Sequence, residues 1–319
     1  MKHPKLYGVV LGLALLAPGA VHAADVTLPK TLTWTAYNVN STGYSQAVAI
    51  GKTLKDAYGT TLRVVPGKND ISRLSPVRAG KIHFSAAGSG TFYAFEGVFD
   101  FANPGWGPQP VRLTISARSN ACLSMGTAKD ANIKTPKDLR GKRVGWVRGS
   151  PSLQTNVSAM MAFGDLTWDD VVKVEMPGFA AAWRGLANGQ IDAMTGFTVG
   201  GLAKQAEAST RGLHWLAFPH ADSAGWSRIN AMAPHMMKTT ATLGVAGISK
   251  SNPMECIAFP YPILISYANQ DANLVYNMTR AVNEQFPNFS GALPAAKGWA
   301  TKRQSFKWVI PYHPGAIKF

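Results

Sequence analysis

The chain has 319 residues, of which 46% are hydrophobic and 15% charged, so it is long enough for about two domains with buried cores. Its 32 lysines and arginines exceed 17 acidic residues and give a formal net charge of +15. The charges are dispersed, and no basic stretch has the pattern of a nucleic-acid-binding fold, so we expect no nucleic-acid partner. Two explanations of the charge remain: a positive field that attracts small anions, and a solvated surface.

The first 23 residues have the parts of a secretory signal peptide. Lys2 and Lys5 form a basic start, residues 6–17 are apolar, and the segment ends on the small side chain of Ala23. An apolar run of this length is too short for a membrane anchor, which needs about 20 residues. We therefore expect cleavage after Ala23 and export of a soluble chain to the periplasm.

The first part of the mature chain alternates strands and helices. We predict strands at 33–37, 61–66, 82–87 and 111–117, and helices at 44–55, 71–79 and 91–97, the second of them capped by Asp70. Polar, glycine-containing turns at 38–43 and 88–90 follow the first and third strands. This order favours a parallel sheet, in which ligands bind beyond the carboxyl ends of the strands.

The second part repeats this order. We predict strands at 141–147, 171–176, 191–195 and 215–218, helices at 153–163 and 178–188, and another helix after the turn at 196–201. Residues 220–251 have no clear pattern, 258–267 are extended and apolar, and 272–284 have helical periodicity. Two similar α/β units predict two lobes that face each other across a cleft, with amide-rich helix starts directed into it.

Cys122 and Cys256 are the only cysteines. An oxidising compartment permits a disulfide, but the spacing of the two residues along the chain does not distinguish a disulfide from two buried thiols.

Catalytic motifs are absent from the sequence. There is no Gly-x-Ser-x-Gly nucleophile turn and no His-Glu-x-x-His zinc motif. We therefore expect a protein that is not an enzyme and that holds no metal and no cofactor.

Several runs together resemble the TAXI family, the solute-binding proteins of TRAP transporters. These runs are Asn-Ser-Thr-Gly-Tyr at 40–44, Asp-Leu-Arg-Gly-Lys-Arg-Val at 138–144, Asn-Gly-Gln-Ile-Asp-Ala at 188–193 and His-Pro-Gly-Ala at 313–316. The resemblance implies an α/β fold, that of a two-lobed type II periplasmic binding protein, with a mostly parallel sheet flanked by helices in each lobe and the ligand cleft between the lobes. It also implies a monomer that delivers a small organic anion, a carboxylate or an amino acid, to a TRAP membrane permease driven by an ion gradient.

The expected lobe boundaries follow from the two repeated units. We expect residues 24–116 with 260–319 to form lobe 1, and residues 117–259 to form lobe 2.

The candidate ligand-binding residues lie mainly at strand ends and helix starts. They are Asn40, Ser41, Thr42, Tyr44, Ser89 and Phe92 in the first lobe and Ser150, Ser152, Gln154, Phe197 and Thr198 in the second, with Trp183 as an aromatic wall. Helix capping is the alternative explanation for the serines and threonines, and core packing is the alternative for Phe92, Trp183 and Phe197.

Arg73 is the candidate clamp for a ligand carboxylate, because a guanidinium can bind both oxygens, and Arg148 is a second candidate. An exposed helix face is the alternative explanation for Arg73. An alternative function keeps the fold and replaces the transporter: a receptor of an ATP-driven importer for a sulfonate, a nitrate-like anion or a pyrimidine.

Overall fold

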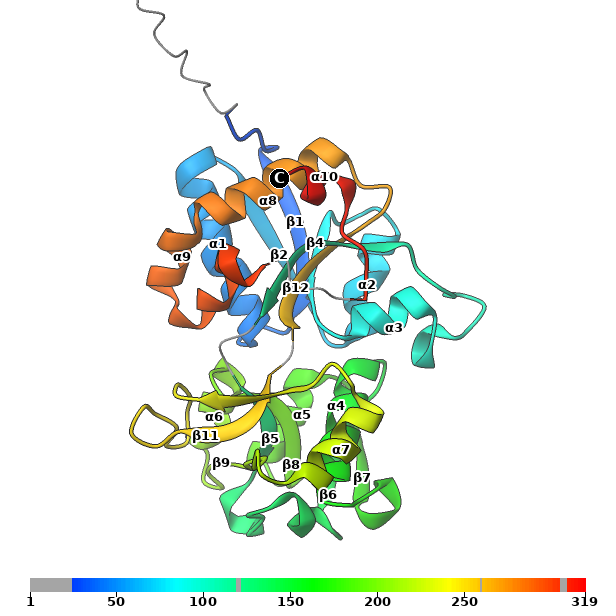
Figure 1. The fold of residues 1–319 in the computed structure, drawn as a ribbon, viewed down its shortest axis with the longest axis vertical. Coiled ribbons are helices and arrows are strands. Elements are labelled where there is room, and N and C mark those ends of the chain that lie inside the picture. Colours follow the sequence, from blue (N-terminus) through cyan, green and yellow to red (C-terminus); the bar gives the residue numbers. More distant parts are fainter. Residues whose placement is uncertain (1–24, 119–121, 259, 305–308) are drawn as a thin grey trace, which may run out of the picture.

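The computed structural model describes residues 25–118, 122–258, 260–304 and 309–319. These residues form two lobes, stacked one above the other in Figure 1, and each lobe is built on its own β-sheet. The predicted signal peptide, residues 1–23, lies outside the described residues.

The sheet of the first lobe has five strands in the order β2-β1-β3-β12-β4. Their bounds are β1 Thr31–Tyr37, β2 Thr61–Gly67, β3 Phe84–Ala87, β4 Val111–Arg118 and β12 Pro260–Tyr267. The first three strands run parallel, whereas β12 pairs with both β3 and β4 in antiparallel fashion. A segment from late in the chain is therefore a central strand of the first sheet.

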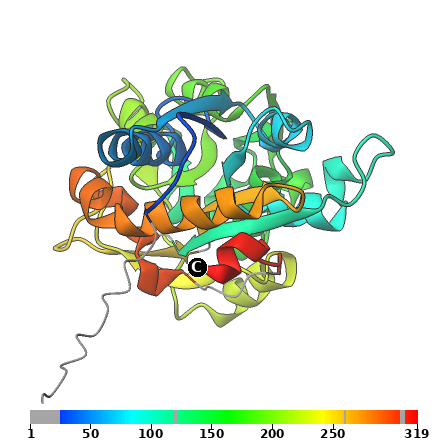
Figure 2. The same cartoon turned by 90° about the horizontal axis from the view of Figure 1, so that it is seen from above.

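Helices cover both faces of this sheet (Figure 1). They are α1 Thr42–Tyr58, α2 Asp70–Arg78, α3 Gly90–Glu96, α8 Ala272–Glu284, α9 Phe286–Ala292 and α10 Pro314–Lys318. One core joins Trp34 and Ile50 to residues of α8 and α9, and another gathers Leu74 with Phe101. Figure 2 shows α8 and α10 side by side, so the chain ends on the lobe in which it begins.

The second lobe contains a seven-stranded sheet in the order β10-β11-β5-β8-β6-β7, with β9 paired to β5. The strands are β5 Leu123–Thr127, β6 Arg143–Val147, β7 Val172–Met176, β8 Ala193–Phe197, β9 His214–Trp215, β10 Met237–Ala241 and β11 Met254–Ala258. The helices are α4 Pro151–Phe163, α5 Phe179–Ala187, α6 Gly201–Glu207 and α7 Ser223–Met232.

The two-lobed α/β fold predicted from the sequence is confirmed, but both sheets are mixed rather than mostly parallel. In the second lobe β6 runs parallel to β7 and β8, while β5 is antiparallel to β8 and β11. Two of the antiparallel strands, β5 and β12, enter their sheets directly from the other lobe, without a crossover helix to reverse the chain.

One predicted helix cap is wrong. The side chain of Asn69, rather than that of Asp70, accepts the capping hydrogen bond from the Ser72 N–H of α2. Asp70 is the first residue of the helix and is buried with 1% of its surface exposed. Its carboxylate is therefore available for another role.

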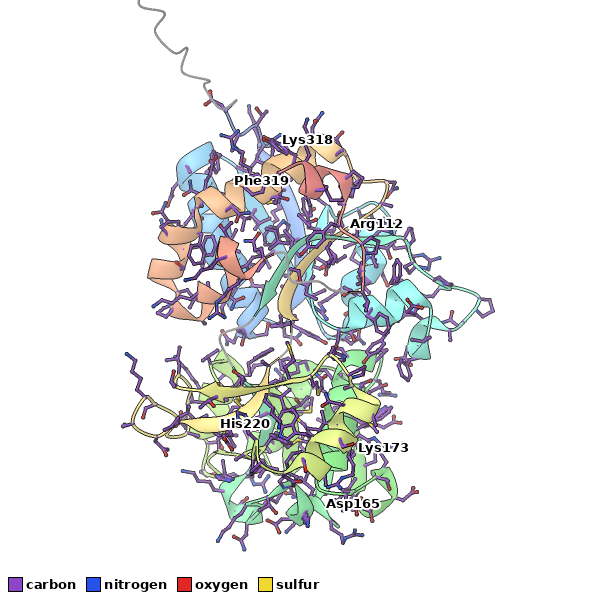
Figure 3. All side chains as sticks on the ribbon, in the orientation of Figure 1. Arg112, Asp165, Lys173, His220, Lys318 and Phe319 are labelled. Atoms are coloured by element: carbon purple, nitrogen blue, oxygen red, sulfur yellow. A yellow bond between two sulfur atoms is a disulfide. The ribbon has the colours of Figure 1, made fainter. Side chains whose placement is uncertain are left out.

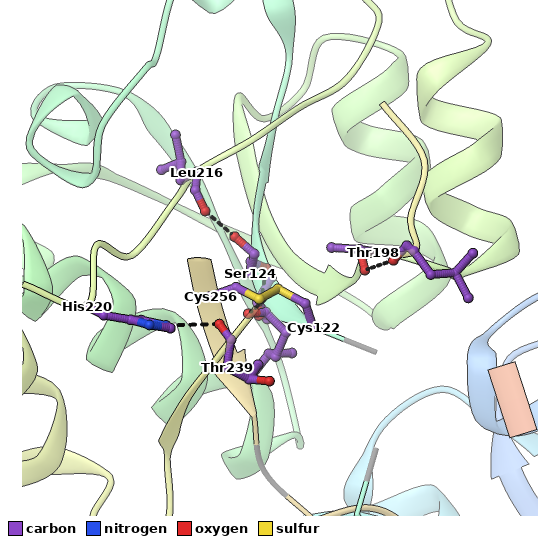
Figure 4. The surroundings of a disulfide bond; sticks show 10 residues. Cys122, Ser124, Thr198, Leu216, His220, Thr239 and Cys256 are labelled. Atoms are coloured by element: carbon purple, nitrogen blue, oxygen red, sulfur yellow. Dashed lines mark hydrogen bonds between the residues drawn. A yellow bond between two sulfur atoms is a disulfide. The ribbon is translucent and has the colours of Figure 1, made fainter. Parts of the chain in front are cut away.

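Cys122 and Cys256 form a disulfide, with their Cα atoms 5.9 Å apart (Figure 4). Cys122 directly precedes β5, and Cys256 lies in β11. The two strands are neighbours in the second sheet. The bond therefore lies within one lobe and ties together residues 134 positions apart. This settles the question that the sequence left open.

No helix in the described part of the chain is both long enough and apolar enough to cross a bilayer. Figure 3 places Lys318 and Phe319 at the outer end of the first lobe, Asp165 toward the outer end of the second lobe, and Lys173 about midway along it. The three charged side chains among them lie away from the contact between the lobes.

Candidate functional site

A cavity of about 40 Å³ lies between the lobes at the carboxyl ends of strands. Both lobes contribute to its lining: Tyr37, Asn40, Ser41, Thr42, Arg73, Gly88, Ser89 and Tyr261 from the first, and Leu123, Ser152, Leu153, Asn156, Phe179, Trp183, Gly196, Phe197, Gly200, Leu202 and Ala203 from the second. A volume of this size holds a few water molecules, so the lobes are close together in this structure.

A buried ion pair lies at the first-lobe side of the cavity. The Nη2 of Arg73 lies 2.6 Å from the Oδ1 of Asp70, and both side chains are almost completely buried. The guanidinium carbon also lies 3.7 Å above the ring of Tyr37, and Nη1 donates to the Ala86 carbonyl at 2.8 Å. Burial opposes the charge of Arg73, but Tyr37 and Asp70 raise its pKa above the ordinary value.

Asp70 joins this cluster to the second lobe. Its Oδ2 accepts a hydrogen bond from the Ser152 N–H at 2.9 Å, at the first turn of α4. The hydroxyl of Tyr37 donates to Asp70 Oδ1 at 2.9 Å and lies 2.9 Å from Ser150 Oγ and 3.3 Å from Ser152 Oγ. Burial, followed by the charge of Asp70, raises the pKa of Tyr37, so this hydroxyl keeps its proton.

Backbone groups of the two lobes are bonded around this cluster. The Ile71 N–H donates to the Gly149 carbonyl at 3.2 Å, and the Phe179 N–H donates to the Lys68 carbonyl at 3.0 Å. On the other side of the cavity the Leu202 N–H donates to the Asn40 carbonyl at 3.3 Å. These bonds satisfy main-chain groups that an open cleft would expose to water, and they hold the lobes in the closed arrangement.

Four of the buried lining residues carry a polar side-chain atom without a hydrogen-bond partner among the described residues. These atoms are Arg73 Nε, Ser89 Oγ, Asn156 Oδ1 and Trp183 Nε1. Each of the four residues is at most 2% exposed. Because a buried polar group without a partner costs about 1–3 kcal/mol, their gathering around one cavity indicates a place prepared for a polar guest.

Aromatic rings form much of the remaining wall. Phe197 stacks on Tyr261 with ring centroids 4.7 Å apart, and Phe179 contacts both Tyr37 and Trp183. A Cβ built on Gly196 would lie 2.4 Å from Cζ2 of Trp183, so only glycine lets the indole lie where it does. The cavity therefore combines flat apolar walls with a few polar atoms, as small-molecule sites do.

The structure brings many of the predicted ligand-binding residues to this cavity. Those that line it are Asn40, Ser41, Thr42, Arg73, Ser89, Ser152, Trp183 and Phe197. Ser41 also caps α1 by accepting from the Tyr44 N–H, so the capping explanation holds for it as well. Arg73 is buried and not on an exposed helix face, but the carboxylate that it binds belongs to Asp70 of the same chain.

The other predicted residues do not line the cavity. Ser150 lies behind it, against Tyr37, and Thr198 donates to the Leu243 carbonyl at 3.2 Å. Arg148 and Gln154 line a separate open groove between the lobes, and Arg148 reaches Glu175 at 3.6 Å. Tyr44 and Phe92 lie in α1 and α3 without reaching the lining.

Sequence reasoning missed several lining residues, chiefly Tyr37, Asn156, Phe179 and Tyr261. Helical spacing was the available signal for two of them. Asn156 lies one turn after Ser152 in α4, and Phe179 lies one turn before Trp183 in α5. Tyr37 and Tyr261 come from strands, and nothing in their local sequence distinguishes them from core aromatic residues.

The sequence matches the NMT1-like family over residues 38–319. The chain belongs to the NMT1-like family. This membership overturns the resemblance to the TAXI family, and with it the predicted TRAP permease. Of the two transport functions expected from the sequence, the comparisons support the alternative, a solute-binding protein of an ATP-driven importer, better than the TRAP receptor.

Three of the four quoted runs make structural contacts within a lobe. His313 caps α10 by accepting from the Gly315 N–H, and a Cβ on Gly315 would lie 2.2 Å from the Ala272 carbonyl oxygen of α8. Arg143 and Asp192, from the two other long runs, bind each other at 2.6 Å at the start of their strands. These motifs therefore hold elements together within each lobe.

Several solved structures are similar to this chain, and the first named here supports the fold. A protein from Bordetella bronchiseptica RB50 is 15% identical, with a TM-score of 0.51 over 91% of this chain and 88% of its own. The alkanesulfonate-binding protein SsuA from Xanthomonas axonopodis pv. citri, bound to MOPS, is 14% identical, with a TM-score of 0.49 over 85% and 79%. The periplasmic aliphatic sulphonate binding protein SsuA from Escherichia coli is 12% identical, with a TM-score of 0.45 over 88% and 82%. At these identities the likeness concerns the fold alone.

Proposed function

We propose that this member of the NMT1-like family is an extracytoplasmic receptor that captures a small solute between its lobes and delivers it to an ATP-driven membrane importer. The observation that carries the proposal is the cavity between the lobes, with its aromatic walls and four buried polar atoms that lack partners. Such a site is complete only when the two lobes are closed. Solute binding is therefore coupled to closure of the lobes.

The export signal and the lobe boundaries that the sequence predicts belong to this function. Residues 1–23 act as the signal peptide that directs export, residues 24–116 with 260–319 form lobe 1, and residues 117–259 form lobe 2. The ligand-binding residues are those that line the cavity.

A binding role, rather than catalysis, fits the lining residues. Among the described ones there is no histidine, cysteine, aspartate or glutamate to serve as a base or nucleophile partner. The lining hydroxyl that bonds an acid is that of Tyr37, and this acid, Asp70, is already bound to Arg73 and to the Ser152 N–H. Such a fully bonded carboxylate activates no nucleophile.

Extraction of the purified protein tests the proposal. The protein is expressed with its leader, purified from the periplasmic fraction without added solutes, and denatured, and the released small molecules are analysed by mass spectrometry. We expect one solute at close to one molecule per chain, and expect its return to the emptied protein to change the tryptophan fluorescence through Trp183. Absence of any solute, together with no response to a broad metabolite panel, would reject the proposal. An ATPase gene beside the gene for this protein would support the importer.

A further inference from the structure

The cavity has a distinctive charge balance. Among its described lining residues, Arg73 is the only lysine, arginine, histidine, aspartate or glutamate. Its positive charge is balanced at 2.6 Å by Asp70, and the remaining oxygen of Asp70 binds the Ser152 N–H at 2.9 Å. The protein's own carboxylate thus joins an arginine of one lobe to a helix start of the other.

This arrangement leaves no compensating charge for a guest. An anion would enter a site whose cation is already neutralised, and a cation would find no free carboxylate on the described lining. Placing an uncompensated charge in a buried site costs several kcal/mol, whereas a neutral polar group costs little if it is hydrogen-bonded. Zwitterions meet the same obstacle at their ammonium end.

The unpartnered atoms specify the polar groups that fit. Arg73 Nε and Trp183 Nε1 are donors, Asn156 Oδ1 is an acceptor, and the Ser89 hydroxyl can act as either. A carbonyl or ring nitrogen satisfies the donors, and an N–H or O–H satisfies Asn156. The rings of Phe179, Phe197 and Tyr261 form an apolar wall against which a flat molecule can pack.

We propose that the solute is uncharged: a small, flat molecule with at least one hydrogen-bond acceptor and one donor. The Asp70 carboxylate takes the place of a ligand anion and bridges the lobes itself. This inference rests on the proposed function and narrows its substrate class. It replaces the carboxylate ligand expected from the sequence.

Two isosteric triplets test the charge directly: benzamide, benzoate and benzamidinium, and acetamide, acetate and acetamidinium. Their affinities for the emptied protein are measured by calorimetry and thermal shift at pH 7. The amide is expected to bind at least tenfold more tightly than either charged analogue. The electrophoretic mobility of the natural solute at pH 7 supplies a second measurement, and we expect no net migration. Because a zwitterion would not migrate either, we also expect the structure identified by mass spectrometry to contain no ionised group.

Asp70→Asn tests the cause, because it preserves shape but leaves Arg73 unneutralised. We expect the ratio of benzoate to benzamide affinity, or of acetate to acetamide, to rise at least tenfold. Ser150→Ala is the matched control: it removes a contact of Tyr37 between the lobes without changing charge, so it lowers all affinities together and leaves the ratio unchanged. Asp56→Asn, on an exposed face, controls for net charge.

The outcomes separate the two proposals. If the emptied protein binds the carboxylate or amidinium more tightly than the amide, or if the natural solute is ionised, the uncharged class is wrong while the receptor function stands. If Asp70→Asn folds but leaves the ratio unchanged, Asp70 is not the reason for the selectivity and the inference is overturned. If neither triplet nor any extracted solute binds, the receptor function itself is rejected.

Discussion

The Asp70 carboxylate accepts a hydrogen bond from the Ser152 N–H across the contact between the lobes, at 2.9 Å. An anion at the start of an α-helix is stabilised by the free N–H groups and by the helix dipole. Here the anion is an internal one, held also by Arg73 and by the Tyr37 hydroxyl. Closure of the lobes is therefore built partly into the protein and does not depend only on the guest.

Removing the Tyr37 hydroxyl is predicted to weaken closure while the fold persists. Tyr37→Phe loses contacts with Asp70, Ser150 and Ser152 but keeps the ring beneath Arg73. At about 1 kcal/mol for a hydrogen bond, we expect a loss of about 1–2 kcal/mol in solute affinity, read by titration, and a larger radius of gyration in X-ray scattering. Tyr58→Phe, which affects only a contact with Glu284 and Gln285 in the first lobe, is the control. An unchanged affinity in Tyr37→Phe would contradict this account of closure.

Arg73→Ala is predicted to destabilise the protein by about 3–5 kcal/mol, because Asp70 would remain buried without its counter-charge. Urea unfolding at pH 7 measures this loss. Arg148→Ala removes a cation from an exposed pair with Glu175 and should change the unfolding free energy by less than about 0.5 kcal/mol. Equal effects of the two substitutions would show that the buried pair has no special role.

The disulfide is predicted to stabilise the second lobe without shaping the site. Cys122→Ser combined with Cys256→Ser should cost about 2–5 kcal/mol, because the bond closes a long loop of the unfolded chain. Solute affinity should stay within about twofold, since neither cysteine lines the cavity. A reductant should cause the same loss of stability in the native protein and should have no effect on the double variant. A reductant effect that persists there would indicate another cause.

Acid is predicted to weaken the second lobe through Asp192. Burial alone would raise the pKa of Asp192, but hydrogen bonds from Arg143 and Arg211 lower it to about 2. The stabilisation, about 2 kcal/mol, is present above about pH 4 and is lost as the pH falls toward 2. Urea unfolding between pH 2 and 6 should show this slope, and Asp192→Asn should remove it. An identical slope in Asp192→Asn would place the titration elsewhere.

Gly196→Ala is predicted to impair binding more than folding. The added methyl would lie 2.4 Å from the Trp183 ring, which must then shift within the cavity. We expect solute affinity to fall at least tenfold and the tryptophan emission of the empty protein to change. Gly291→Ala, where the added methyl meets nothing within 4 Å, is the matched control and should alter neither. An unchanged solute affinity in Gly196→Ala would show that Trp183 is not part of the binding site.

The elements that were predicted well have strong local patterns. Helix α8 has the expected bounds, because its apolar residues recur on one face and Asp271 caps its start. Strand β5 was missed although it is central in its sheet, because it is buried throughout and lacks an alternating pattern. The region 220–251, which was not assigned, contains α7 and β10.

The cavity could be predicted only in part. Ser41, Ser89 and Ser152 were found because they lie where strands end and helices begin, a position that the chain order itself reveals. Tyr261 reaches the cavity only because β12 returns to the first sheet, and Asn156 only because α4 directs that face toward the other lobe. Neither placement can be read from the residues that are close to Tyr261 or Asn156 in the sequence.

The sequence by itself determined that this is a two-lobed α/β protein whose helix starts face a cleft, because secondary structure and chain order depend on local patterns. Only the tertiary structure decided that the Asp70–Arg73 pair of one helix meets Ser152 of the other lobe. Electrostatic compensation depends on distance in space, and Asp70 and Ser152, which are 82 positions apart, come within hydrogen-bonding distance only when the two lobes close.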